Sequence, residues 1–324
     1  MNHQVFFILL KLCRNTIKVV FVQRKYWSTL LNNLNLFMHQ NFTNFGRWLF
    51  SAAMIGCFVS CTKDPGDPGQ LGNSKSFTIF NAMQYQNMPD LSSNGLHSIN
   101  LINETSLFTA PTDLIPDSLK VENLAIQAAN SPGIPVVMDI EDWSYSNSQL
   151  PTTIDWFLDV IRVFKQNDPG PLGFYGVVPN DAYNWSFIEP VGGSNYVKWQ
   201  TLNSQLSPIA DQVDLFFPSF YTDDNDTVSW NSFLNATISE LKKYNTNKPV
   251  YAFVWPQYHD GYPNQYQFVD TSVWKYELEA LYPLVDGIVI WSSSKILPGV
   301  SSTWDADWPW WLTTQAFIKE HNIQ

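Results

Sequence analysis

The chain has 324 residues and a formal net charge of −11, with 45% hydrophobic and 15% charged residues. This composition excludes a disordered, highly charged chain, and the length suffices for one large domain or two small ones. The acidic balance argues against a nucleic-acid partner, because binding to phosphate requires a basic surface.

The first sixty residues differ in charge from the rest of the chain. All 29 acidic residues lie after residue 60, whereas Lys and Arg occur on both sides of it. An apolar stretch over 48–60 follows Arg47, is too short for a comfortable membrane span, and ends just before Cys61 and a polar segment. This order resembles a bacterial lipoprotein signal. The resemblance implies that Cys61 carries the lipid, that the lipid is the only membrane contact, and that the protein lies at the bacterial outer membrane. Lys63-Asp64, just after Cys61, resembles a surface-export signal of such lipoproteins, which implies exposure at the surface.

Four segments follow from this reading of the chain. Residues 1–37 fit neither a signal nor a domain, so we expect Met38 to be the true start and 1–37 to be an upstream extension. Residues 38–60 are then the signal peptide, and the Pro/Gly-rich residues 61–75 are a flexible tether. No second linker follows, which predicts a single domain over 76–324. Because all three cysteines lie at or before position 61, this domain is predicted to have no disulfide and no cysteine-bound metal.

Short, continuously apolar runs alternate with segments of helical period in the body of the chain. Such runs are typical of parallel strands buried on both faces. Between the third and fourth runs, residues 152–166 place apolar side chains on one helical face. This alternation predicts an α/β fold, a distorted (β/α) TIM-like barrel of about seven parallel strands. A doubly wound open sheet is the alternative, but no Gly-rich phosphate loop follows the first run. The seven predicted strands are 77–80, 99–102, 134–140, 172–178, 213–217, 250–255 and 285–291.

Candidate functional residues stand where these strands end, the edge at which (β/α) barrels carry catalysis. Asp139 and Glu141 are two positions apart at the end of the third strand, so both carboxylates project to one face. Two carboxylates this close repel each other, which raises one pKa and suits a general acid. Tyr183, Tyr221 and Trp291 end the fourth, fifth and seventh strands, where their rings can line a sugar site.

Four of these segments, in this order, resemble the hyaluronidase family of glycoside hydrolases. They are Asp139-Ile-Glu-Asp-Trp143; the stretch 173–184, in which Ala182 replaces the family's Cys; Phe217-Pro-Ser-Phe-Tyr221; and the strand 287–293. The resemblance covers residues 77–294 and implies a barrel enzyme without a cofactor or metal. It also implies retaining endo-cleavage of a polysaccharide that contains N-acetylhexosamine, such as hyaluronan or chondroitin.

The resemblance assigns a role to each candidate residue. Glu141 is the acid and then the base, while the substrate's own 2-acetamido oxygen is the nucleophile, an exception to the two-carboxylate scheme. Asp139 orients and stabilises the acetamido group. Tyr221 and Tyr183 hold the same subsite, and Trp291 packs on the sugar.

Two features depart from the family and leave alternatives open. Ser144 follows Trp143 where many animal members have Arg, and Asp223, Asp224 and Asp226 follow Tyr221 in an acidic body that would repel a polyanion. The alternatives are a lysozyme-like glycosidase of peptidoglycan and a surface lipoprotein that binds glycans without turnover. His97, His259 and His321 show no metal-ligand spacing, so no metal site is expected.

Overall fold

The computed structural model describes residues 11–13, 16–18, 76–110, 113–244, 247–292 and 303–324. The chain divides into two compact units, Met1–Gln70 and Leu71–Gln324. In the first unit, β1 (Lys11–Cys13) and β2 (Thr16–Lys18) form an antiparallel pair. The rest of the predicted extension, together with the predicted signal, Cys61 and the tether over 61–75, lies outside the described residues, so these assignments stay predictions.

The second unit contains two parallel sheets. One sheet has the order β4-β3-β9-β8 and the other β5-β6-β7. Apolar β-branched and aromatic side chains dominate these strands, which suits burial on both faces. The strands are β3 (Thr78–Ala82), β4 (Leu96–Ser98), β5 (Asn100–Asn103), β6 (Val136–Asp139), β7 (Leu172–Phe174), β8 (Tyr251–Val254) and β9 (Gly287–Trp291).

The two sheets join on both sides and close a barrel. On one side, only Ile99 separates β4 from β5, so residues 96–103 are one bent strand shared by both sheets. On the other side, the 215–222 segment lies between β7 and β8, with parallel bridges that pair Phe217 with Tyr175 and Phe216 with Val250. This segment forms bridges rather than a regular strand because Pro218 has no N–H to donate to a ladder. The predicted seven-stranded (β/α) barrel is thereby confirmed within the described residues.

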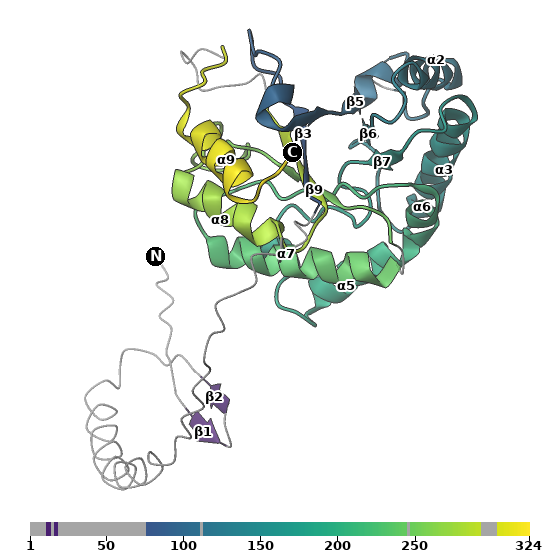
Figure 1. Ribbon diagram of the computed structural model, residues 1–324. Helices are drawn as coiled ribbons and strands as arrows, with labels where there is room; N and C mark the ends of the chain where they lie inside the picture. The colour runs from purple at the N-terminus through teal and green to yellow at the C-terminus, as the bar shows by residue number, and fades with distance from the viewer. Residues whose placement is uncertain (1–10, 14–15, 19–75, 111–112, 245–246, 293–302) are drawn as a thin grey trace, which may run out of the picture. The chain divides into compact units, whose positions relative to one another are not determined.

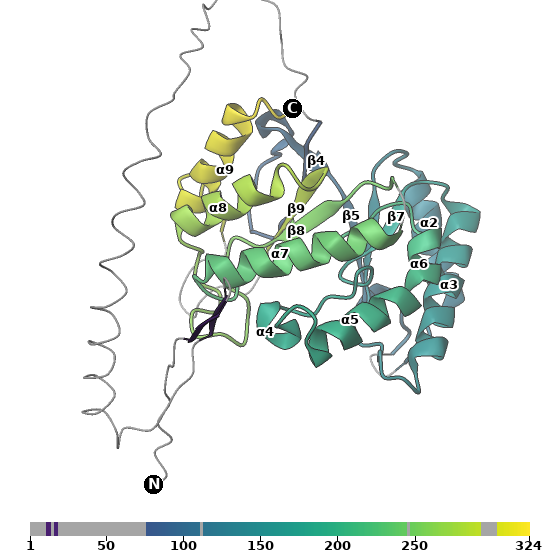
Figure 2. The same ribbon diagram turned by 90° about the horizontal axis from the view of Figure 1, so that it is seen from below.

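Helices surround the strands (Figure 1), and α7 runs along the outside of β8 and β9 (Figure 2). The predicted helix over 152–166 is confirmed as α3, which begins two residues earlier because Pro151 fits the first turn of a helix. No helix in the described part of the chain is long and apolar enough to cross a membrane. The helices are α2 (Ser118–Ala129), α3 (Leu150–Asn167), α4 (Trp185–Ile188), α5 (Ser194–Gln205), α6 (Ser207–Gln212), α7 (Thr227–Leu241), α8 (Thr271–Leu281) and α9 (Pro309–Glu320), with 3₁₀ turns η2 (Ser92–Asn94), η3 (Glu104–Ser106) and η4 (Lys242–Tyr244).

Two apolar cores follow from the alternation of side chains along the strands. Outward-facing residues such as Ile79 pack under the helices, where Trp274, Trp310 and Phe157 are fully buried. Inward-facing residues fill the barrel itself, and these are Phe80, Ala82, Val137, Leu215, Phe217, Phe253 and Val289. The interior is therefore packed, and side chains farther along the same inward-facing rows emerge at the carboxyl ends of the strands.

Candidate active site

The inward-facing rows deliver four predicted residues to one pocket at the carboxyl end of the barrel. On β6, Val137 fills the interior, and Asp139 and Glu141 follow on the same face while Ile140 is buried on the other. Tyr221 lies one residue before the end of the 215–222 segment, and Trp291 ends β9. All four line the same pocket.

Aromatic rings form much of the wall of this pocket. The Tyr221 ring stacks with Trp291 at a centroid distance of 5.7 Å and with Tyr175 at 5.8 Å, while Trp255 meets Trp291 edge-on at 4.9 Å. The Tyr175 hydroxyl donates to Ser219 Oγ at 3.0 Å. Packed rings with few rotatable bonds give rigid, flat surfaces that suit the apolar faces of sugars.

The charged form of the Asp139 carboxyl group is in an unfavourable environment. Its Oδ1 atom is buried and has no hydrogen-bond partner in the described residues. Burial, followed by the charges of Glu141 and Glu104, raises its pKa from 3.8 to about 7. The Asp139 carboxyl group therefore keeps its proton to a higher pH than a free carboxyl group does, and one of its oxygens is left without a donor.

Glu141 stands at the open side of the pocket and is exposed to solvent as a residue. Its pKa is raised by desolvation of the carboxyl group and then by the charge of Glu104, while His259 opposes the shift. Glu104, in η3, also fixes the backbone here, because its Oε2 accepts from the Glu141 N–H at 3.0 Å. A raised pKa keeps a carboxylic acid protonated at higher pH, as a general acid requires.

Sequence reasoning missed several pocket residues. Tyr175, Trp255 and His259 line the pocket beside Glu141. Asp181 lies close enough to interact with Glu141, and burial raises its pKa to about 6. The signal that would have found two of them is the alternation itself, since Tyr175 is two positions beyond Gly173 on β7 and Trp255 is two beyond Phe253 on β8. His259 and Asp181 stand on loops, where no alternation applies.

Tyr183 does not line this pocket. The chain leaves β7 at Phe174 and turns at Gly176, whose φ of +64° suits glycine, so Tyr175 takes the inward position instead. Tyr183 is 65% exposed and lines a neighbouring pocket that also contains Tyr221 and Asp223. Four of the five predicted pocket residues are therefore brought together, and the fifth stands one pocket away.

Solved structures with the same fold are known. Bee venom hyaluronidase in complex with a hyaluronic acid tetramer matches with a TM-score of 0.53 and 13% sequence identity, over 76% of this chain and 96% of that chain. A monoclinic crystal structure of bee venom hyaluronidase matches with a TM-score of 0.50 and 13% identity, over 76% of this chain and 97% of that chain. At this identity the likeness shows the fold alone. No family model matches the chain, and no curated protein matches its sequence.

Proposed function

We propose that this protein is a glycoside hydrolase that cleaves a polysaccharide containing N-acetylhexosamine, within the chain and with retention of configuration. The single observation that carries the proposal is the buried, unpartnered Oδ1 of Asp139 beside Glu141 in an aromatic-walled pocket. A buried acceptor without a donor is costly, and a ligand N–H that reaches it removes that cost. The N–H of a 2-acetamido group is such a donor. The barrel shared with bee venom hyaluronidase, a protein solved with a hyaluronic acid tetramer, supports the same class of substrate.

In this proposal, cleavage proceeds through the acetamido group of the substrate. Glu141 donates its proton to the glycosidic oxygen. The acetamido oxygen attacks the anomeric carbon as the bond between that carbon and the glycosidic oxygen breaks. Asp139 accepts a hydrogen bond from the acetamido N–H and stabilises the positive charge of the ring that forms. Water then attacks the anomeric carbon as the bond from that carbon to the acetamido oxygen breaks, which regenerates the acetamido group, and the water gives a proton to Glu141, which restores the acid. Tyr221 and Trp291 hold the sugar against the wall of the pocket.

The test measures release of reducing ends by the purified full chain. The substrates are hyaluronan, chondroitin, peptidoglycan and a neutral N-acetylhexosamine polymer, each with wild type and with Glu141→Gln. We expect cleavage of at least one polymer, formation of the retained anomer by NMR, and loss of turnover with retained binding in the variant. Cleavage of peptidoglycan alone would support the lysozyme-like alternative. Equal binding by both proteins with no cleavage of any polymer would refute the glycosidase and leave a glycan-binding protein.

The cellular location is a second proposal and has its own test. We propose that Cys61 is lipidated after removal of the 38–60 signal and anchors the protein at the bacterial outer membrane. The support is the charge pattern and the apolar stretch before Cys61. The wild type is expected in the membrane fraction with an acylated Cys61 by mass spectrometry, and Cys61→Ser is expected in the soluble fraction. Membrane association that survives the substitution would contradict the lipid anchor.

A further inference from the structure

A second pocket adjoins the candidate active site on the other side of Tyr221. It holds about 710 Å³ of empty volume, and Tyr221 lines both pockets. Its walls come from the loop after β7, the residues after the 215–222 segment, and the first turns of α7. We call it the Asp223 pocket. Because Tyr221 lines both pockets, the two lie next to each other at the carboxyl end of the barrel.

Hydrogen bonds between three loops hold the Asp223 pocket in shape. The Asn184 Nδ2 group donates to Asp223 Oδ2 at 2.6 Å and contacts the Tyr262 hydroxyl at 2.5 Å. The Asn184 Oδ1 atom accepts from the backbone N–H of Ser186 at 2.9 Å. One asparagine thus ties together loops that follow β7, the 215–222 segment and β8, so the pocket exists before any ligand binds.

Acidic side chains line both pockets. Asp223, Asp224 and Asp226 line the Asp223 pocket, and Asp139, Glu141 and Asp260 line the active site. Asp226 caps α7 by accepting from the N–H groups of Val228 and Ser229, and these bonds lower its pKa, so it stays ionised. Neither pocket has a Lys or Arg among its described lining residues. Such a groove repels a uronate carboxylate and attracts an ammonium group.

Exposed aromatic rings at the rim provide an independent indication of a sugar ligand. Tyr183 lines the Asp223 pocket and is 65% exposed, whereas Phe187 is 56% exposed and lines an adjoining pocket that Tyr183 also lines; their ring centroids lie 6.0 Å apart. Trp185 and Tyr262 line the pocket just inside this rim. Large rings left in water next to a preformed pocket mark a binding surface. Aromatic faces combined with carboxylates also recognise cationic groups through cation–π and ionic contacts.

We propose that the Asp223 pocket is a second sugar subsite that takes a hexosamine with a free amino group. The preferred substrate is then a hexosamine polymer without uronate that is partly de-N-acetylated: one unit keeps its acetamido group for Asp139, and a neighbouring unit presents an ammonium group to Asp223 and Asp224. Tyr183 belongs to this second subsite rather than to the acetamido subsite. The inference rests on the proposed function and narrows its substrate.

The test measures binding with the full chain carrying Glu141→Gln, so that cleavage does not interfere. Calorimetry compares three hexasaccharides: a fully N-acetylated hexosamine oligomer, the same oligomer partly de-N-acetylated, and hyaluronan. We expect the de-N-acetylated oligomer to bind about tenfold more tightly than the other two at low salt, with the advantage shrinking in 1 M NaCl because salt screens exposed charges.

Two sets of variants locate the effect. Asp224→Asn, and separately Asp223→Asn, should reduce the affinity for the de-N-acetylated oligomer several-fold more than the affinity for the N-acetylated oligomer. Asp211→Asn removes the same charge from the exposed end of α6 and should change neither. The double variant Tyr183→Ala and Phe187→Ala should weaken binding of all hexasaccharides and spare disaccharides.

The outcomes separate the inference from the proposed function. Hyaluronan that binds as tightly as the de-N-acetylated oligomer, or Asp variants that bind like wild type, would overturn the inference. If the wild-type chain then still cleaves hyaluronan, the proposed glycosidase stands. If no oligomer binds to Glu141→Gln and none is cleaved by wild type, both fail.

Discussion

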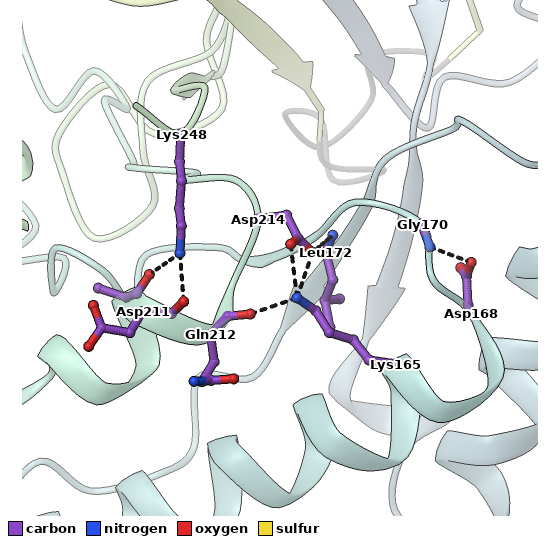
Figure 3. Close-up of polar contacts among 9 residues, drawn as sticks. Lys165, Asp168, Gly170, Leu172, Asp211, Gln212, Asp214 and Lys248 are labelled. Atoms are coloured by element: carbon purple, nitrogen blue, oxygen red, sulfur yellow. Dashed lines mark hydrogen bonds and ion pairs between the residues drawn. The ribbon is translucent and has the colours of Figure 1, made fainter. Parts of the chain in front are cut away.

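Carboxylates are in opposite electrostatic environments at the two ends of the barrel. At the amino ends of the strands, Lys165 Nζ lies 2.9 Å from the Asp214 carboxylate and 2.7 Å from the Gln212 carbonyl, and Asp214 also accepts from the Leu172 N–H (Figure 3). Lys248 Nζ donates to two carbonyls at the end of α6, at 2.6 and 2.8 Å. Positive charge at a helix carboxyl terminus is favourable, so this end is electrostatically satisfied.

At the carboxyl ends of the strands, the same residue types are left crowded. Asp139 has an unpartnered oxygen, and the pKa values of Asp139, Glu141 and Asp181 are all raised. No lysine stands among the described residues that line the pocket. The contrast indicates that paired charges stabilise one end of the barrel, while the charged forms of the crowded carboxyl groups destabilise the other.

The largest expected effect is on turnover at the crowded end. Replacing a general acid by its amide lowers the rate by about 10²–10⁴-fold, so Glu141→Gln should reduce kcat by roughly 10³-fold. Glu141 is exposed, so the melting temperature should change little. The proposed step needs the protonated form of Glu141, and this form is lost as the pH rises through the raised pKa of its carboxyl group. Wild-type kcat should therefore fall over that pH range. Steady-state kinetics and calorimetry of both proteins check this, and a variant with wild-type kcat would remove Glu141 from the chemistry.

A second buried acid behind the pocket should govern how stability depends on pH. Glu277 is 1% exposed, accepts from Thr222 Oγ1 at 2.8 Å, and its pKa is raised by burial from 4.5 to about 8. The folded state therefore holds this proton more tightly than the unfolded chain, and the free energy of unfolding should fall on the order of a few kcal/mol as the pH rises from 4.5 through 8. Glu277→Gln should flatten this slope in urea titrations. The exposed control Glu320→Gln should leave the slope as in wild type.

One substitution made at both ends tests the contrast directly. The raised pKa of Asp139 means that its charged form destabilises the fold above about pH 7, so Asp139→Asn should raise the free energy of unfolding at pH 8 by about 1–2 kcal/mol, after allowing for its partial exposure. Asp214→Asn removes the charge that faces Lys165, and should lower it by about 1–3 kcal/mol. Denaturant titration of both variants at pH 8 measures the signs. Two changes of the same sign would refute the contrast between the ends.

The smallest expected effect is the difference in unfolding free energy between loss of the Lys165 contacts, at the amino ends of the strands, and loss of an exposed surface ion pair. Lys165→Ala leaves the Gln212 carbonyl and Asp214 without this donor, which should cost about 1–2 kcal/mol of unfolding free energy. Arg162→Ala on the same helix breaks an exposed ion pair with Asp159 and should cost less than about 0.5 kcal/mol. Thermal and urea unfolding of the two variants compare them. Equal losses would mean that the Lys165 contacts contribute no more than a surface pair.

The sequence by itself determined the architecture and the position of the acids. Each of the seven apolar runs corresponds to a strand or bridged segment of the barrel, because strands buried on both faces need continuous apolar residues. The spacing of Asp139 and Glu141 was enough to put both on the inward face, since side chains alternate along a strand. The location of Trp291 and Tyr221 at strand ends followed from the same rule.

Only the tertiary structure decided which side chains share the pocket and how they titrate. The turn at Gly176 brings Tyr175 inward and leaves Tyr183 at the rim, and a turn's direction depends on backbone angles that a pattern of apolar residues does not encode. Glu104, which raises the pKa of both catalytic candidates, lies 37 residues from Glu141 in the chain. Its effect exists because parallel pairing sets β5, which η3 follows, beside β6, and electrostatic energy depends on distance in space rather than along the sequence.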